Sequence, residues 1–182
     1  MAKVLYSATI SLDGFMAGPS GDMSWLADYL GPNPVAEGLV DQIGALLVGR
    51  RTFEGDDPNR GTEKEGALEG AWQGPQFVLT HAPPPEGPAF PGIRFVSGDV
   101  ADVVAAAREA AEGRDVVVIG AAVARECLGA GVLDELLVHV APGLLGAGVR
   151  LVETLPAGPV RLERLGTADD GPLATLRFRV VR

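Results

Sequence analysis

Short apolar segments, each ending in a small or hydroxyl residue, are the feature that most constrains the fold of this chain. Residues 45–48 and 115–119 are almost wholly apolar, the pattern of strands buried on both faces. Each is followed by a glycine, Gly49 or Gly120, at which a helical pattern begins. Residues 76–80 form a third such segment and stop before prolines that cannot continue a central strand. Together they predict an α/β fold with a mostly parallel sheet and helices on both faces.

The rest of the chain completes this pattern. Further strands are predicted at 3–12 and 93–96, helices at 35–43, 99–113 and 120–129, and longer strands at 134–141, 159–167 and 172–181. The late change from helices to turns predicts antiparallel strands at the C-terminal end of the sheet. Residues 54–75 are polar and glycine-rich, which predicts a mobile surface excursion with one short helix. We find no repeat or linker, so we expect a single domain over residues 1–182.

Composition narrows the classes of function. The 24 acidic and 15 basic residues give a net charge of −9, which argues against nucleic acid as the main partner. No apolar run approaches the roughly 20 residues that span a bilayer, and the N-terminus lacks a secretory signal pattern. We therefore expect a cytoplasmic protein without a membrane partner. The single cysteine, Cys127, lies in a helical pattern and is interpreted as a small core residue.

The residues that follow the predicted parallel strands favour a ligand site. In open sheets of this kind, ligands bind beyond the carboxyl ends of the strands. Those ends carry Leu12-Asp13-Gly14, then Gly49-Arg50-Arg51-Thr52-Phe53, then Thr80-His81, and then Gly120-Ala121-Ala122-Val123. Glycines let backbone approach a ligand closely, and free N–H groups at a helix start suit phosphate. Arg50, Arg51 and His81 add cationic donors.

The stretch ISLDGFMAGPSGD, residues 10–22, joins the first strand to a loop with three glycines. A loop that mixes Phe15 and Met16 with glycines is typical of one that closes over a ligand. Asp13, at the strand end, is the best acid/base candidate, because shielding by these two side chains would raise the pKa of its carboxyl. The alternative is that Asp13 only forms an Asp-Gly turn.

Several well-known sites are missing from the sequence. There is no phosphate-binding P-loop motif, and Gly146-Ala147-Gly148 lacks the later glycine of a dinucleotide fingerprint. One cysteine cannot supply the Cys-x-x-Cys pair of a zinc deaminase, and two histidines make a multi-histidine metal site improbable, so we expect no metal. His139, within an apolar strand pattern, is interpreted as a core or sheet histidine. A Ser-His-Asp hydrolase stays open, although no G-x-S-x-G elbow is present.

Five segments together resemble one known family. They are ISLDGFMAG, LLVGRRTFE, FVLTH, VVVIGAAVARECL and GVLDELLVHVAPGLLGAGVRL. They resemble the dihydrofolate-reductase-fold family that includes the C-terminal reductase domain of bacterial riboflavin biosynthesis, over nearly the whole chain. The resemblance implies a three-layer fold and an NADPH-dependent reductase that transfers a hydride to a small heterocyclic, pyrimidine-like or pterin-like, or carbonyl substrate. It also implies that the opening loop is a lid over nicotinamide and substrate.

The resemblance also assigns roles to individual residues. It implies a catalytic role near the reacting centre for Asp13 and substrate contacts for Leu12, Trp25 and Phe53. The implied cofactor-binding residues are Ala8, Gly49, Arg50, Arg51, Thr52, Thr80, His81, Gly120, Ala121, Ala122 and Val123. The acid that dihydrofolate reductases carry on the first helix has no match at the expected spacing, Asp28 being the nearest.

Two departures keep a second class of function open. Relatives commonly have Gly-Gly after the fourth strand, where this chain has Gly120-Ala121, and residues 54–75 are mainly acidic. A non-catalytic ligand-binding or assembly protein on the same fold is therefore the alternative. The apolar segment 132–152 further predicts a homodimer formed through a sheet edge or by sheet packing.

Overall fold

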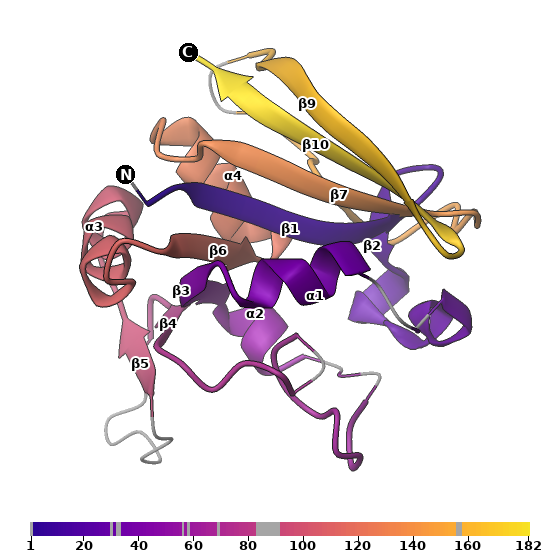
Figure 1. The fold of residues 1–182 in the computed structure, drawn as a ribbon, viewed down its shortest axis with the longest axis horizontal. Coiled ribbons are helices and arrows are strands. Elements are labelled where there is room, and N and C mark those ends of the chain that lie inside the picture. The colour runs from indigo at the N-terminus through magenta and orange to yellow at the C-terminus, as the bar shows by residue number, and fades with distance from the viewer. Residues whose placement is uncertain are drawn as a thin grey trace.

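One eight-stranded sheet organises the computed structural model (Figure 1), which describes residues 2–29, 31, 34–55, 57, 59–68, 70–82, 92–155 and 158–182. Its strand order is β5-β4-β3-β6-β1-β7-β10-β9. The strands are β1 (Val4–Ser11), β3 (Ile43–Gly49), β4 (Gln76–Leu79), β5 (Ile93–Val96), β6 (Asp115–Ile119), β7 (Glu135–Ala141), β9 (Arg161–Asp170) and β10 (Leu173–Val181). The six strands from β5 to β7 run parallel, whereas β10 is antiparallel to both β7 and β9. This confirms the predicted mixed sheet with antiparallel C-terminal strands.

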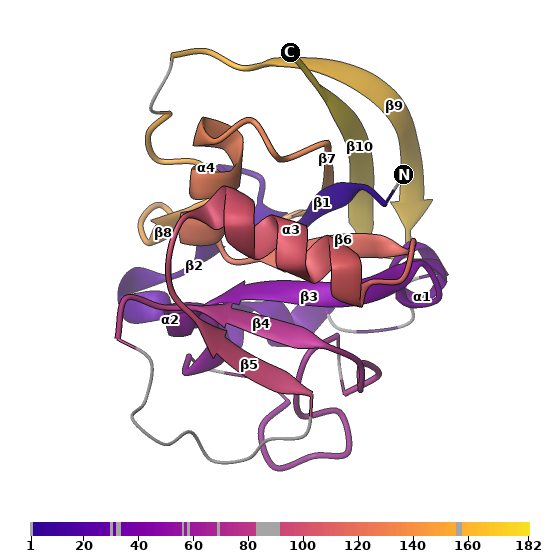
Figure 2. The ribbon, with the colours of Figure 1, turned by 90° about the vertical axis from the view of Figure 1, so that its left-hand side faces the viewer.

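Helices cover both faces of the sheet, as predicted (Figure 2). On one face, α3 (Val100–Ala110) and α4 (Ala121–Gly129) pack against a core that includes the even-numbered β1 residues Val4 and Tyr6. On the other face, α1 (Pro34–Val40) packs its Leu39 against Leu5 and Leu137. The odd and even positions of β1 therefore face different layers, as the two-residue period of a strand requires.

The start of α3 shows how local sequence sets an element. The Asp99 carboxylate accepts a hydrogen bond from the Ala101 N–H at 2.8 Å and so caps the first turn. Val100, Val103, Val104 and Ala107 follow at helical spacing and are buried against the sheet. The helix predicted over residues 99–113 is therefore confirmed, with Asp99 as its cap.

A second, two-stranded sheet was not predicted. It pairs β2 (Phe15–Ala17) with β8 (Val149–Arg150). Gly148, just before β8, has a φ of +134°, and a Cβ there would overlap the Ala17 carbonyl oxygen and the backbone of Gly18. The segment after β1 and the segment after β7 are therefore in direct backbone contact.

The structure narrows one expectation about chain organisation and contradicts another. Strand β7, in the centre of segment 132–152, is flanked by β1 and β10, so it offers no sheet edge to a second copy. The edges of the sheet are β5 and β9, and a homodimer by any other contact stays a prediction. Helix α2 (Arg50–Phe53) ends just before segment 54–75. The described part of that segment has turns and no helix, so the short helix predicted there is not found.

The remaining short elements are 3-10 helices, η1 (Pro19–Gly21) and η2 (Ser24–Tyr29). Cys127 is fully buried on α4, and burial raises the pKa of its thiol to about 12, in agreement with its interpretation as a core residue. Among the described residues, no helix is both long and apolar enough to cross a membrane.

An ion cluster around one buried carboxylate links the residue before β1 to β10, the last strand. Glu135 on β7 is only 4% exposed and lies 3.0 Å from the Lys3 ammonium and 2.8 Å from the Arg177 guanidinium. Burial raises the pKa of this carboxyl, but hydrogen bonds from Lys3 and Arg177 outweigh burial and hold the pKa below its usual value. The carboxylate therefore stabilises the fold fully above its unfolded-state pKa, and this contribution is lost as the pH falls through the folded-state pKa.

Replacing Glu135 by Gln is expected to lower the free energy of unfolding by about 1–3 kcal/mol at pH 7. The loss is smaller than for a fully buried pair because both cations stay partly exposed. Urea unfolding measures it, with Glu163→Gln as the matched control. Glu163 pairs with Arg179 at 2.8 Å on the surface, where the loss should be at most about 0.5 kcal/mol. Equal losses in the two variants would contradict the assignment.

Candidate active site

Three neighbouring strands end at one rim of the molecule. Strand β3 lies between β4 and β6, with Gly49 opposite Leu79 and Val48 opposite Ile119. The segments that follow these strands therefore meet at the carboxyl edge of the sheet. They are the predicted cofactor residues Gly49 to Thr52, Thr80 with His81, and Gly120 to Val123, which the structure brings together as the sequence predicted.

The two glycines let the helices after β3 and β6 approach each other. A Cβ on Gly49 would lie 3.1 Å from the Val123 side chain, and one on Gly120 would overlap the Thr52 hydroxyl. Gly120 also has a φ of +107°, a backbone conformation that is strongly disfavoured for any residue with a Cβ. These glycines therefore fix the contact between α2 and α4 at the rim.

Donors for an anion are present along this rim. Gly120 is the N-cap of the nine-residue α4 and has no side chain to cap the helix, so the first turn keeps its N–H donors for a ligand. Arg50 is already engaged, with Glu54 at 2.8 Å and the Ala82 carbonyl oxygen at 3.2 Å. Arg51 and His81 are exposed, and Arg51 makes no hydrogen bond or ion pair with any described residue.

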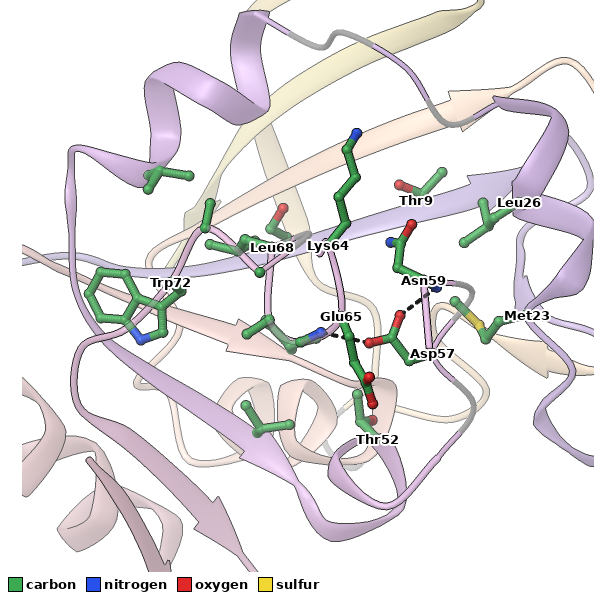
Figure 3. Close-up of a pocket in the computed structure, with 18 of the residues that line it drawn as sticks. Thr9, Met23, Leu26, Thr52, Asp57, Asn59, Lys64, Glu65, Leu68 and Trp72 are labelled. Atoms are coloured by element: carbon green, nitrogen blue, oxygen red, sulfur yellow. Dashed lines mark hydrogen bonds between the residues drawn. The ribbon is translucent and has the colours of Figure 1, made fainter. Parts of the chain in front are cut away.

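A cavity of about 880 Å³ opens beside the rim (Figure 3). Ala8, Val48, Thr52 and Ile119 line it where it meets the strand ends. Its apolar walls come from the opening loop, η2, α2 and the segment after α2, through Met16, Met23, Leu26, Tyr29, Phe53, Leu68 and Trp72. This size and mixed lining are typical of sites for small organic molecules.

The floor of the cavity carries hydroxyl and imidazole groups. Ser7 and Thr9 of β1 line it together with His139 of β7, whose Cα is the register partner of Thr9. His139 is 4% exposed, and its Nδ1 lies 2.7 Å from the hydroxyl of the buried Thr175 on β10. His139 is a sheet histidine as predicted, but it also faces the cavity, which the sequence interpretation missed.

The segment after α2 forms the outer wall of the cavity. The Asp57 carboxylate accepts the N–H of Asn59 at 2.8 Å and that of Gly66 at 2.7 Å, as drawn in Figure 3. Glu65 accepts the N–H of Gly61 at 2.9 Å. The polar and glycine-rich composition of 54–75 therefore builds compact turns held by carboxylates.

Asp13 lies outside the described lining of the cavity and holds the opening loop in place. One carboxylate oxygen accepts the Ser11 hydroxyl at 2.6 Å and the Leu145 N–H at 3.1 Å, and the other accepts the Gly146 N–H at 2.7 Å. These hydrogen bonds lower the pKa of its carboxyl to about 2, the Ser11 bond most. The prediction of a raised pKa for Asp13 is therefore wrong. Its carboxylate is surrounded by N–H and hydroxyl donors, and not shielded by apolar side chains as predicted.

Of the three residues that the resemblance implies to contact the substrate, Phe53 lines the cavity, and Leu12 and Trp25 do not. Phe53 lines the cavity and packs edge-to-face against Phe95 at 5.5 Å. Leu12 is 68% exposed on the turn after β1, where its N–H bonds the Gly143 carbonyl at 2.8 Å. The Trp25 indole N–H donates to the Met16 carbonyl at 3.2 Å and so ties η2 to the opening loop. Neither Leu12 nor Trp25 belongs to the described lining.

Two signals in the sequence would have found more of this site. Ser7, Thr9 and Ser11 alternate with apolar residues in β1, a pattern that places hydroxyls on one face of the strand. The structure puts the first two of these on the cavity floor. Glu37 is the acid on the first α-helix, and it lines the cavity where Asp28 does not.

This topology and this site define a dihydrofolate-reductase-like fold. A dihydrofolate reductase from Enterococcus faecalis, solved in complex with NADP(H), shares the fold with a TM-score of 0.62 and 19% identity, over 99% of this chain and 97% of its own. A putative riboflavin biosynthesis protein from Shewanella sp. PV-4 aligns over 100% of both chains, with a TM-score of 0.76 and 23% identity.

The family follows from the sequence comparison. The family model of the RibD C-terminal domain matches residues 2–174, so the chain belongs to this family. A structure from Thermotoga maritima, a diaminohydroxyphosphoribosylaminopyrimidine deaminase/5-amino-6-(5-phosphoribosylamino)uracil reductase, matches with a TM-score of 0.68 and 19% identity. The match covers 99% of this chain but only 57% of that one. The search of curated proteins finds no match.

Proposed function

We propose that this chain is an NADPH-dependent reductase that transfers a hydride to a small heterocyclic or carbonyl substrate. The observation that carries the proposal is the meeting of the rim with the cavity. Thr52 belongs to the rim and also lines the cavity, beside Ala8 and Phe53. A dinucleotide held along the rim would therefore place its reactive end at the cavity. Membership of the RibD C-terminal domain family supports the same activity.

The residues present fit such a cofactor. The uncapped first turn of α4 and Arg51, which pairs with no residue that the structure describes, suit phosphate groups, and the exposed His81 adds a third donor. Ala121 is half-buried in this turn, where relatives commonly carry a second glycine. NADPH would supply the hydride, and the chain would supply orientation and a site from which water is excluded.

Each part of the site then has a task. Met16, from the opening loop, and Phe53, from α2, exclude water from the cavity. Ser7, Thr9 and His139 offer hydrogen bonds that orient the substrate. Asp13 is proposed as a positioning residue, because a carboxyl with a pKa of about 2 is ionised near neutral pH and holds no proton to donate. We place the reductase in the cytoplasm.

Titration with NADPH, with NADH in parallel, tests the proposal. Tryptophan fluorescence is a suitable signal because Trp72 lines the cavity. Arg51→Ala is expected to weaken NADPH binding by roughly tenfold and to leave NADH binding nearly unchanged, since only NADPH carries the extra phosphate. Arg114→Ala is the control, because Arg114 is exposed just before β6, at the amino end of that strand.

The outcomes separate the two classes of function. Micromolar NADPH binding, together with NADPH oxidation on a panel of heterocyclic and carbonyl compounds, supports the reductase. Binding of neither nucleotide would overturn it and favour a non-catalytic protein on the same fold. An equal loss of affinity in Arg51→Ala and Arg114→Ala would remove Arg51 from the cofactor site.

A further inference from the structure

The charge of the cavity lining is unusual for a site that handles phosphate esters. Among the described lining residues, three are acidic, Glu37, Asp57 and Glu65, and Lys64 is the one with a permanent positive charge. His139 on the floor adds at most one further positive charge. The acidic groups therefore outnumber the cations even if the imidazole is protonated.

Two of the three carboxylates are fixed in position. Asp57 is held by the N–H groups of Asn59 and Gly66, and Glu65 by that of Gly61, so neither can swing far from the cavity wall. A phosphate dianion placed there would meet two negative charges held in fixed positions and would be repelled by them. Figure 3 shows both Asp57 and Glu65 among the residues that line the cavity.

The cations of the chain can be located in full. Every Lys, Arg and His of the sequence lies within the described residues. Arg60, on the same segment, donates to the Gly55 carbonyl oxygen at 2.8 Å, and Arg50 is paired with Glu54. Arg51 belongs to the rim, and no described arginine lines the cavity. A phosphate inside the cavity would therefore lack the guanidinium fork that usually holds such groups.

The rest of the lining suits a molecule without a net negative charge. Ser7, Thr9 and His139 supply hydrogen bonds for ring nitrogens and carbonyl oxygens at the floor. Leu26 and Trp72 supply apolar surface for a flat ring. Neutral heterocycles need this combination of apolar contact and a few placed polar groups.

We propose that the substrate of this cavity is an unphosphorylated nitrogen heterocycle that is uncharged or positively charged. That the bound molecule is a substrate rests on the proposed reductase function, which this inference makes more specific. The cavity then rejects the phosphate ester that the name of the Thermotoga maritima protein gives for that enzyme.

A matched pair of compounds tests this directly. The pair is 5-amino-6-(5-phosphoribosylamino)uracil and the same compound after removal of its phosphate by a phosphatase. Dissociation constants are measured by tryptophan fluorescence on the full chain, with and without NADPH. We expect the unphosphorylated compound to bind at least about tenfold more tightly, a size that one or two like-charge contacts supply.

A charge reversal shows whether the lining causes the preference. Glu37→Lys is expected to narrow the ratio of the two dissociation constants by about tenfold. Glu109→Lys makes the same charge change on the exposed side of α3, on the opposite face of the sheet, and should leave the ratio unchanged. Both variants lie on helices, and thermal unfolding verifies that each is folded.

The results divide cleanly between the two proposals. Equal or tighter binding of the phosphate ester, binding of neither compound, or equal ratios in the two variants would each overturn the inference about the substrate. Failure of NADPH to bind, with the preference for the unphosphorylated compound intact, would overturn the proposed reductase and leave the preference of the cavity standing.

Discussion

Replacing Gly120 by Ala is expected to abolish measurable NADPH binding and to lower the free energy of unfolding by about 2–6 kcal/mol. Two effects add at this position. The φ of +107° strains any residue with a Cβ, which costs about 1–3 kcal/mol. The new methyl would also overlap the Thr52 hydroxyl, and forcing such a contact costs about 1–3 kcal/mol more. We expect the overlap to push α2 away from α4, and these helices carry two of the three segments that form the rim.

The control is Gly131→Ala, just beyond the other end of α4. Gly131 also has a positive φ, +69°, but a Cβ there has nothing within 4 Å. This variant therefore reports backbone strain without the overlap, and we expect a loss of about 1–2 kcal/mol with NADPH binding unchanged. Urea unfolding and the fluorescence titration measure both quantities. Normal NADPH binding by Gly120→Ala would show that the contact between α2 and α4 does not shape the rim.

The parallel strands could be predicted because their sequences carry the cause of their burial. Strands covered on both faces are apolar, and β3 is apolar throughout, while β6 is apolar after its first residue, Asp115. The glycines that follow them mark the strand-to-helix turns, so the rim could be predicted as well. The two-stranded sheet could not, because β2 and β8 have three and two residues and show no period.

The errors share one physical origin, which is contact between segments far apart in the chain. The apolar segment 132–152 suggests a sheet edge because nothing in the sequence of β7 shows that β10 pairs with it. Residues 54–75 lie at the surface as predicted, but their sequence does not show that they also form a cavity wall, since glycine and acidic residues are common in both settings. Ala67, Leu68 and Trp72 of this segment pack against the core of the sheet, a contact that the local sequence does not reveal.

Asp13 could be singled out from the sequence as a functional candidate, but the groups around its carboxylate could not be predicted. Its donors Leu145 and Gly146 lie more than 130 positions away in sequence. Local sequence showed only Phe15 and Met16, which suggested apolar shielding and a raised pKa. The distant N–H groups reverse the sign of the pKa shift, and with it the role that the carboxyl can take.

Replacing Asp13 by Asn is therefore expected to release the loop between β7 and β8. An amide has one acceptor oxygen where the carboxylate has two, so it cannot satisfy Ser11, Leu145 and Gly146 together. Hydrogen exchange of the Leu145 and Gly146 amides should accelerate by about 10- to 100-fold, while the amides of β7 keep their protection. Steady-state NADPH oxidation should fall with it, because the released loop no longer supports the lid.

The pH dependence gives a second measurement of the same contact. Because the folded-state pKa of Asp13 is lowered from 3.8 to about 2, the carboxylate holds the loop fully above pH 3.8 and releases it as the pH falls toward 2. The wild-type loop should therefore lose protection over this range, and Asp13→Asn should show no such transition.

Asp22→Asn separates this contact from any general effect of losing a carboxylate in the opening segment. Asp22 accepts the Ser24 N–H at 2.9 Å, a bond that lowers the pKa of its carboxyl, but it makes no described contact with residues 143–148. Its replacement should leave the exchange of Leu145 and Gly146 unchanged. If Asp13→Asn instead lowers the rate of NADPH oxidation while exchange at Leu145 and Gly146 stays as in the wild type, Asp13 acts on the reacting centre itself, as the family resemblance implied. Loss of both the exchange protection at these amides and the rate of NADPH oxidation would show that the Asp13 carboxylate acts by holding the lid in position.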